Sequence, residues 1–244
     1  FLERKWGVHY AMGGTGKLVQ GLVGLVEHLG GTVLLEHEVK AITFDGNRAT
    51  GVELATGETI SSDLVISNAD AAWTYRELVP ADLRKRWTDK RIKKLKYSMS
   101  LFVWYFGTKG HYRDVDHHTI LLGPRYKGLL DDIFDNLRLG DDFSLYLHRP
   151  TATDPSMAPD GHDAFYVLSP VPHLGSEIDW SEKSEAYRKL ISQYLSNTIL
   201  PGLEENLVTS RILTPQGFRD DLLSVQGAAF GMQPTLTQSA YFRP

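Results

Sequence analysis

Apolar residues recur at helical spacing near the start of the chain, and shorter apolar runs follow. Leucine and valine fall about one helical turn apart over 18–29, and Gly30 favours an end to the helix there. The next part has short runs rich in β-branched residues, which predict strands at 32–35, 38–44, 49–54, 58–60 and 63–67. The first third of the chain therefore predicts one helix followed by several strands, two of them joined as a hairpin around Thr56-Gly57.

The remainder predicts longer elements of both kinds. The charged stretch 71–96 and the stretch 181–200 fit helices, and the second has Ser181 as a candidate N-cap. Further strands are predicted at 98–106, 143–148, 164–168 and 207–214. Long segments separate these strands, which suits a mixed sheet flanked by helices. The expected fold class is mixed α/β (α+β), with no clean alternation that would build a complete doubly wound sheet.

Composition narrows the function classes. Hydrophobic residues make up 42% and charged residues 23% of the 244 residues, which is typical of a globular protein. The net charge of -4 argues against a general nucleic-acid binder, since phosphate binding needs clustered basic residues. The absence of cysteine excludes disulfides, cysteine-ligated zinc and a thiol nucleophile within the chain. We expect a cytoplasmic protein.

No apolar run approaches the roughly 18 residues that a membrane-spanning helix needs. The basic clusters Arg84-Lys85-Arg86 and Lys90-Arg91 are typical of a solvated helix face. An alternative is peripheral contact with an anionic membrane surface. The chain opens on Phe1 and ends on Pro244 without the features of natural termini, so we expect an internal fragment of a longer protein.

Several stretches, taken in order, are specific. In the first third they are Trp6-Gly7-Val8-His9-Tyr10, Gly13-Gly14-Thr15-Gly16-Lys17-Leu18-Val19-Gln20, Glu38-Val39 after Leu29-Gly30-Gly31, and Asp63-Leu64-Val65-Ile66-Ser67-Asn68-Ala69-Asp70. Later they include Ser100-Leu101-Phe102-Val103-Trp104-Tyr105-Phe106-Gly107, Asp142-Phe143-Ser144-Leu145-Tyr146-Leu147-His148 and Leu236-Thr237-Gln238-Ser239-Ala240-Tyr241-Phe242-Arg243-Pro244. This series resembles the middle of bacterial phytoene desaturases, which belong to the flavin family that also holds amine oxidases.

The resemblance implies an FAD-dependent enzyme that dehydrogenates phytoene, a lipophilic polyene, during carotenoid biosynthesis. It implies three parts: 1–75 completes an FAD-binding domain, 76–235 forms the substrate-binding domain, and 236–244 returns toward the FAD-binding domain. The sequence departs from the family in one respect. It has no Gly-x-Gly-x-x-Gly dinucleotide-binding unit, and it ends before the family's second glycine-rich flavin segment. We therefore expect the isolated chain to be inactive.

The resemblance also implies residues that contact FAD. Val39 matches a strand whose backbone contacts the adenine end, although a buried strand valine is an equally simple interpretation. Asn68 and Ala69 match a strand end near the ribose and pyrophosphate, where Asn68 is alternatively a turn former.

Candidate substrate contacts come from two places. Gly13 and Gly14 match a turn on the substrate side, where glycine permits close approach, or they simply begin a helix. Trp6, Tyr10, Phe102 and Trp104 are candidates for an aromatic tunnel wall around a polyene. For aromatic residues in strands, a place in the core is the more common outcome.

No catalytic acid or base is identified, and no metal site is expected. The histidines and aspartates over 111–118 form a cluster, His111, Asp114, Asp116, His117 and His118, which we interpret as a polar loop. Three alternatives share the scaffold: a carotenoid isomerase or saturase, an amine oxidase, and a non-catalytic escort protein for prenyl lipids. Product analysis and flavin binding distinguish them.

Overall fold

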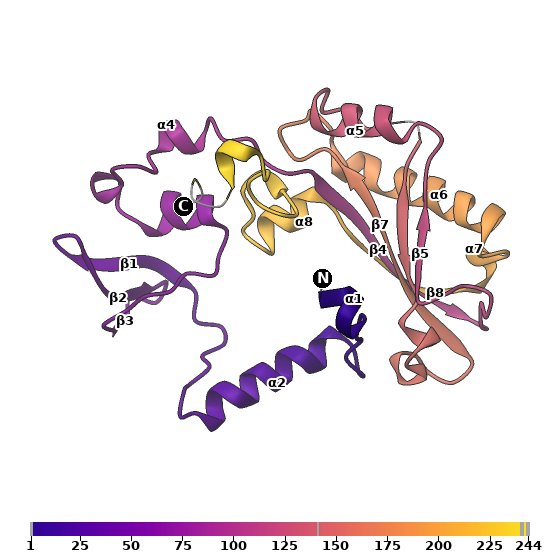
Figure 1. The fold of residues 1–244 in the computed structure, drawn as a ribbon, viewed down its shortest axis with the longest axis horizontal. Coiled ribbons are helices and arrows are strands. Elements are labelled where there is room, and N and C mark those ends of the chain that lie inside the picture. Colours follow the sequence, from indigo (N-terminus) through magenta and orange to yellow (C-terminus); the bar gives the residue numbers. More distant parts are fainter. Residues whose placement is uncertain (1, 141, 240–241, 243–244) are drawn as a thin grey trace.

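The computed structural model describes residues 2–140, 142–239 and 242 (Figure 1). Its helices are α1 (Leu2–Trp6), α2 (Thr15–His28), α3 (Ala71–Trp73), α4 (Asp89–Ile92), α5 (Tyr126–Phe134), α6 (Trp180–Thr198), α7 (Leu203–Asn206) and α8 (Pro215–Asp220). Its strands are β1 (Val39–Asp45), β2 (Arg48–Leu54), β3 (Thr59–Ser61), β4 (Ser100–Lys109), β5 (His118–Leu121), β6 (Leu145–His148), β7 (His162–Val171) and β8 (Leu207–Leu213). The expected combination of helices and strands is confirmed.

The larger sheet has five strands in the order β5-β6-β7-β4-β8. Each neighbouring pair in it is antiparallel, whereas the sequence predicted a mixed sheet. The long β4 pairs with β7 over ten residues and with β8 on its other edge. Strands distant in sequence therefore meet, and the segments between them, including α5 and α6, are free to cover the sheet.

One face of this sheet carries the main core. Alternate residues of β7 are buried because they face α6, which lies alongside the sheet (Figure 1). Ile191 and Leu195 of α6 are fully buried in the same cluster as Val167 of β7. The helix begins after Asp179, whose carboxylate accepts from the Ser181 amide, so the N-cap is Asp179 and not Ser181 as the sequence predicted.

A second, smaller core joins segments far apart in the sequence. Ala72, Trp87 and Tyr97 pack with Val225 and Ala228. The predicted stretch 71–96 is broken into short helical turns, because its apolar residues pack against the C-terminal region and follow no helical stripe. The domain boundary expected at 75/76 falls within the π-helical turn Thr74–Leu78.

The smaller sheet, β1-β2-β3, is an antiparallel meander that includes the predicted hairpin. The strands expected at 32–35 and 63–67 do not form: both stretches lack a paired neighbour among the described residues, and Ile66 is 83% exposed. The preceding helix, α2, follows Gly14, and no side-chain hydrogen bond caps it. The Thr15 hydroxyl cap suggested by sequence is therefore not observed.

None of the helices described is long and apolar enough to cross a membrane. The stretch 236–244 was expected to return toward the FAD-binding domain. The structure describes one 3-10 turn in it, Leu236–Gln238. Residues 240, 241, 243 and 244 of that return lie outside the described residues.

Candidate functional site

A row of polar and aromatic side chains crosses all five strands of the larger sheet, on the face opposite α6. The pairing register places His118 opposite His148, His148 opposite Tyr166, Tyr166 opposite Tyr105, and Tyr105 opposite Arg211. Directly paired residues project from the same face of a sheet. The rings of His148 and Tyr166 are stacked with centroids 4.5 Å apart, and those of Tyr105 and Tyr166 are 5.9 Å apart. We call these five residues the polar row.

A parallel row on the same face is mostly apolar. By the same register it runs across Ile120, Tyr146, Leu168, Val103 and Leu213. Ile120 is 69% exposed, and Tyr105 in the neighbouring row is 42% exposed. Next to Tyr105 a cavity of about 290 Å³ is lined by Tyr105, Arg211, Leu213, Asp221 and Leu222. Together the two rows form the open face of the sheet, an aromatic and apolar surface with few charges.

Two of the predicted substrate contacts lie on the other face. Phe102 and Trp104 are fully buried under α6, where Phe102 stacks on Trp180 with ring centroids 5.7 Å apart. The indole Nε1 of Trp104 donates to Ser210 Oγ at 2.8 Å. Their burial favours the interpretation as core residues. Strand alternation turns Tyr105, between Trp104 and Phe106, toward the open face instead.

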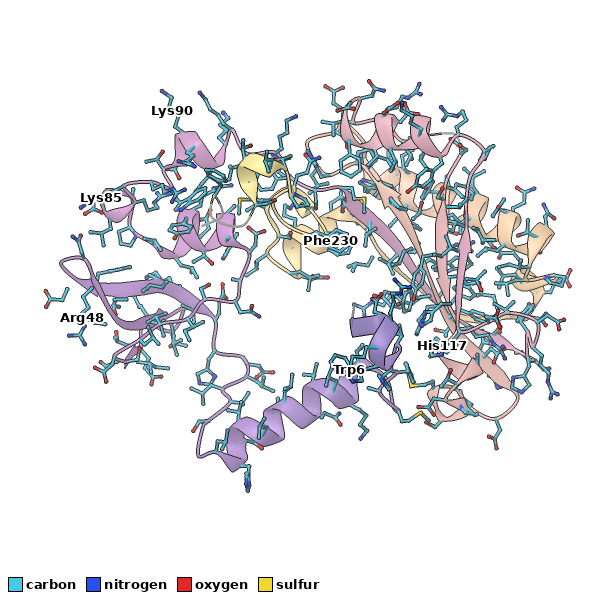
Figure 2. The ribbon with its side chains drawn as sticks, viewed as in Figure 1. Trp6, Arg48, Lys85, Lys90, His117 and Phe230 are labelled. Atoms are coloured by element: carbon cyan, nitrogen blue, oxygen red, sulfur yellow. The ribbon has the colours of Figure 1, made fainter. Side chains whose placement is uncertain are left out.

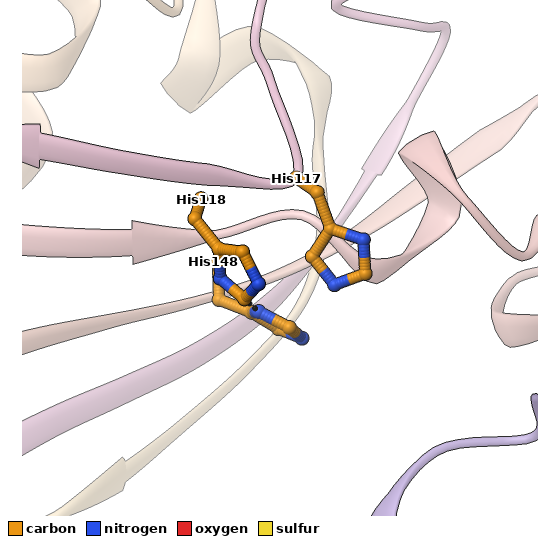
Figure 3. A group of neighbouring side chains, drawn as sticks. All are labelled: His117, His118 and His148. Atoms are coloured by element: carbon orange, nitrogen blue, oxygen red, sulfur yellow. Dashed lines mark hydrogen bonds between the residues drawn. The ribbon is translucent and has the colours of Figure 1, made fainter. Parts of the chain in front are cut away.

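Three histidines meet at the end of the polar row. His118 begins β5, His148 ends β6, and His117 precedes β5, so that their ligand nitrogens all lie within 4.8 Å of one another (Figure 3). We call them the histidine cluster. Burial and the neighbouring imidazoles of His117 and His118 lower the pKa of His148 to about 4. Burial and the neighbouring His118 likewise lower the pKa of His117. These two rings are therefore neutral near neutral pH.

The cluster departs from the grouping predicted along the sequence. His111 pairs instead with the buried Asp163, at 3.2 Å from Nδ1 to Oδ1. Asp114 and Asp116 do not belong to the cluster. His148, thirty residues further on, completes it.

A buried ion pair holds the cluster in place. Arg149 Nε donates to Asp163 Oδ2 at 2.9 Å, and its guanidinium also donates to the carbonyl of Val115 at 2.8 Å. The amide of Arg149 donates to the carbonyl of His117 at 2.9 Å. Asp163 further accepts from the amide of Tyr112. The end of β6, the start of β7 and the loop before β5 are thus tied to one carboxylate.

The N-terminal segment docks beside the cluster. The ring of Tyr10 packs edge-on against His117 with centroids 4.7 Å apart. The amide of Gly13 donates to Asp154 Oδ2 at 2.6 Å, and a Cβ on Gly14 would lie 3.0 Å from Met157 Cε. The structure therefore places Tyr10 next to His117, and Gly13 and Gly14 against the loop after β6.

Trp6 lies near this junction, on α1. Trp6 is 58% exposed, and the Lys5 ammonium lies 4.7 Å from the centroid of its ring. Figure 2 shows Trp6 beside the start of α2 in the same region of the molecule as His117. The role of this exposed indole as a ligand contact remains a prediction.

The predicted flavin contacts fall in a different part of the chain. Asn68 and Ala69 line a cavity of about 450 Å³ together with Asp70, Ala71, Phe218, Leu222, Ser224, Ala229, Phe230, Gly231 and Met232. Gly231 approaches Asp70 so closely that an added Cβ would lie 3.2 Å from a carboxylate oxygen. Val39 begins β1 and does not line this cavity.

These residues fit one part of a nucleotide cofactor. Gly231, with φ +64°, has no side chain to keep a ligand from its backbone, and the Asn68 side-chain amide offers both a donor and an acceptor. Burial raises the pKa of Asp70, although the amides of Trp73 and Ala72 donate to it and lower that pKa. A complete cradle for a pyrophosphate would need a Gly-x-Gly-x-x-Gly turn at a helix N-terminus, and the glycine turn at 13–16, at the start of α2, has a different spacing.

Sequence reasoning missed most of the open face. Each of three predicted strands carries a tyrosine between two apolar residues: Tyr105, Tyr146 and Tyr166. Period-two spacing therefore indicated in principle that each tyrosine lies on the face opposite its apolar neighbours. The sequence could not show which strands are neighbours. Register, and with it the histidine cluster, needed the tertiary structure.

Known proteins resemble this chain along its whole length. The family model described as flavin containing amine oxidoreductase matches residues 1–244. A neurosporene-forming phytoene desaturase of Cereibacter sphaeroides is 47% identical over all of this chain and 48% of its own length. Lycopene-forming phytoene desaturases of a Paracoccus species and of Pantoea ananas are 49% and 45% identical, also over the whole chain and over 49% and 50% of their own lengths. The chain thus spans about half the length of these relatives.

Solved structures share the fold at lower identity. A protein from Pyrococcus furiosus matches 94% of this chain and 53% of its own with a TM-score of 0.59 and 18% identity. An oxidoreductase from Methanosarcina mazei matches 82% of this chain and 42% of its own with a TM-score of 0.57 and 18% identity. With the family model matching from end to end, the chain belongs to the flavin-containing amine oxidoreductase family.

Proposed function

We propose that the protein containing this chain is an FAD-dependent desaturase that removes hydrogen from phytoene. The observation that carries the proposal is identity of 45–49% over the entire chain to three phytoene desaturases. The products named for these relatives differ, neurosporene in one and lycopene in two, so the number of desaturation steps is left to experiment. No relative named above is an isomerase, a saturase or an amine oxidase.

The open face supplies what a polyene would need from the protein. A hydrocarbon chain has no polar handle, so its binding depends on apolar area and aromatic rings. Tyr105, Tyr146 and Tyr166 present such rings along the sheet, and Ile120 and Leu168 lie beside them. We propose that this face, with Tyr10 and Trp6 at one end, lies along the substrate, excludes water and fixes its orientation.

When bound, FAD supplies the hydride acceptor of the reaction. We propose that Asn68 and Ala69 contact it through the cavity they share with Gly231, and that Val39 contacts it through backbone groups of β1. On this proposal residues 1–75 contribute to the flavin-binding part and 76–235 to the substrate-binding part, with 236–244 returning toward the flavin. Neither row on the open face contains a carboxylic acid, and we assign no general acid or base to its histidines or tyrosines.

The test is product analysis in cells. The full-length protein that carries this chain would be expressed in bacteria that accumulate phytoene, and the pigments would be separated and identified by their absorption spectra. Coloured polyenes in place of phytoene are expected, and their identity gives the number of steps. Unchanged phytoene in the presence of a folded, flavin-loaded protein would reject the substrate, and a folded protein without flavin would reject the class of reaction.

The basic segment around α4 supports a second, finer proposal, contact with an anionic membrane surface. The basic residues over 84–91 are less solvated than the sequence suggests. Arg84 is buried and donates to Asp89 at 2.5 Å, and Arg91 lies over the Trp87 ring at 4.5 Å. Lys85 and Lys90 remain exposed and extend outward from the α4 region (Figure 2). Each such residue contributes about 1 kcal/mol near an anionic surface.

The membrane proposal is tested by sedimentation with vesicles. The full-length protein is expected to bind vesicles that contain anionic lipid, to bind neutral vesicles less, and to lose part of that difference in a Lys85→Glu, Lys90→Glu variant. Equal binding to both kinds of vesicle would contradict the proposal. A Lys109→Glu, Lys183→Glu variant, changed at exposed positions of β4 and α6, reverses the same number of charges and is the control.

A further inference from the structure

The histidine cluster has the composition of a metal site. Its members supply three imidazole nitrogens and no carboxylate, and they come from two paired strand ends whose backbones the sheet fixes. Imidazole is the ligand that Zn²⁺, Cu²⁺ and Ni²⁺ accept most readily in proteins. In a tetrahedral site with metal–nitrogen bonds of about 2.0–2.1 Å, ligand nitrogens lie roughly 3.4 Å apart.

The distance between the ligand nitrogens of the two paired histidines already matches that geometry. Nδ1 of His118 and Nδ1 of His148 are 3.4 Å apart, and Figure 3 shows the two rings facing each other across the β5–β6 pair. The third ring, His117, lies within 4.8 Å of both. A small movement of the loop before β5, with the bond from His117 to Thr153 kept, would bring all three nitrogens to one ion.

The hydrogen bonds of His117 leave one nitrogen available. Its Nδ1 is hydrogen-bonded to the Thr153 hydroxyl, and its Nε2 is buried without a hydrogen-bond partner among the described residues. A buried ring nitrogen without a partner is unfavourable unless something binds it. When Nδ1–H donates to the threonine oxygen, the lone pair of Nε2 is directed away from that bond, which is how the outer hydrogen bond of a metal-bound histidine usually fixes its tautomer.

The surroundings are also suitable. The hydroxyl of Tyr146 lies 2.6 Å from His118 Nδ1 and 3.4 Å from His148 Nδ1, so an oxygen already stands next to the place where the two nitrogens meet. Stacking on Tyr166 fixes the ring of His148 from its other side. The Arg149–Asp163 ion pair holds the strand end and the loop that carry the ligands.

We propose that His117, His118 and His148 bind one divalent transition-metal ion of the zinc type, with the fourth position open to the Tyr146 hydroxyl or to water. The ion would join the loop before β5 to the β5–β6 edge of the open face, next to Tyr10. This inference depends only on the histidine geometry and is independent of the proposed substrate. No step of the desaturation is assigned to the ion.

The first experiment uses the full-length protein loaded with its flavin. After exposure to Zn²⁺ and removal of the excess, about one zinc per chain is expected, and affinity is measured by competition with a chromophoric chelator. Co²⁺ serves as the spectroscopic probe, because its visible d–d bands report nitrogen ligation and coordination number. The simultaneous change His117→Gln, His118→Gln, His148→Gln is expected to abolish both signals.

Matched variants separate ligation from folding. His162→Gln alters a half-buried histidine at the start of β7 whose ring bonds the Asp160 carbonyl, and it is expected to leave zinc affinity unchanged. Thr153→Val removes the hydroxyl that orients His117 and is expected to weaken zinc binding about 10–100-fold, whereas Thr153→Ser retains it. Flavin absorbance and the thermal midpoint verify that each variant folds.

Two results would overturn the proposal. One is the absence of zinc binding by the wild-type protein, or zinc binding that the triple variant retains. The other is equal zinc affinity in the Thr153→Val and Thr153→Ser variants. If the triple variant does not fold, the threonine pair and His117→Gln alone decide the question. A rise in the thermal midpoint on adding Zn²⁺, seen in the wild type and absent in folded His117→Gln, would support it.

Discussion

Arg149 and Asp163 form a buried ion pair where β6 ends and β7 begins, with Nε 2.9 Å from Oδ2 and side chains that are 8% and 1% exposed. The pair links the end of β6 to the start of β7. Because the carboxylate also accepts from the Tyr112 amide and the Thr151 hydroxyl, its charge is well compensated. The histidine cluster therefore depends on an ionic contact that none of its own members makes.

Removing one partner of this pair is expected to be strongly destabilising. Arg149→Met leaves a buried carboxylate without its cation, and loss of one member of a buried pair typically costs about 3–5 kcal/mol of unfolding free energy. Arg149→Lys retains the charge but loses the fork that reaches both Asp163 and the Val115 carbonyl, so a smaller loss is expected. Urea unfolding measures both variants, and equal stability of Arg149→Met and wild type would contradict this role.

Stability is expected to fall in acid through the same carboxylate. Burial raises the pKa of Asp163, but hydrogen bonds from the Tyr112 amide, Arg149, Thr151 and His111 outweigh it, so the folded-state pKa lies below the ordinary value. The stabilisation is therefore complete above the unfolded-state pKa and is lost as the pH falls toward the folded-state pKa, below about pH 5. The difference in unfolding free energy between wild type and Asp163→Asn should narrow over that range.

Neighbouring residues of β4 are expected to differ in effect because they lie on opposite faces. Trp104→Ala opens a cavity under α6 and should cost about 3–5 kcal/mol of unfolding free energy. Tyr105→Ala removes a partly exposed ring from the open face and should change stability by less, while it lowers desaturation of phytoene by the full-length protein. Thermal unfolding and pigment analysis measure the pair. If Trp104→Ala lost activity and Tyr105→Ala did not, under conditions in which both variants are folded, the substrate would lie on the α6 face and the proposal would be contradicted.

The contact between the turn before α2 and the loop after β6 is expected to depend on the backbone conformation of Gly14. Gly14 has φ +79° and ψ -177°, a region that is almost restricted to glycine and costs about 1–3 kcal/mol for a residue with a Cβ, and Met157 stands next to the position of that Cβ. Gly14→Ala should therefore loosen the contact between this segment and the loop after β6. Hydrogen exchange and limited proteolysis of 8–28 report the change.

Gly16→Ala is the matched control, because nothing lies within 4 Å of an added Cβ there. This position is within α2, where alanine is the better helix former, and the substitution should stabilise the helix by about 0.8–1 kcal/mol. Equal protection from exchange in the two variants would show that the conformation of Gly14 is not what holds the segment.

Local pattern was sufficient for much of the secondary structure. The helix at 18–29, the hairpin around Thr56-Gly57 and strands close to β4, β6, β7 and β8 followed from periodicity and turn residues, because each depends mainly on neighbours in sequence. The strands expected at 32–35 and 63–67 did not form. A strand exists only when a second strand completes its hydrogen bonds, and the described part of this chain offers none to either stretch.

By itself the sequence determined the family, through a series of motifs that runs the length of the chain, and the mixed composition of helices and strands. The tertiary structure decided which residues share a face: it placed Trp104 in the core and Tyr105 on the open face, and it joined His148 to His117 and His118. The physical reason is strand register. Pairing between segments remote in sequence sets which side chains stand opposite one another, and a shift of one residue would turn each of them to the other side.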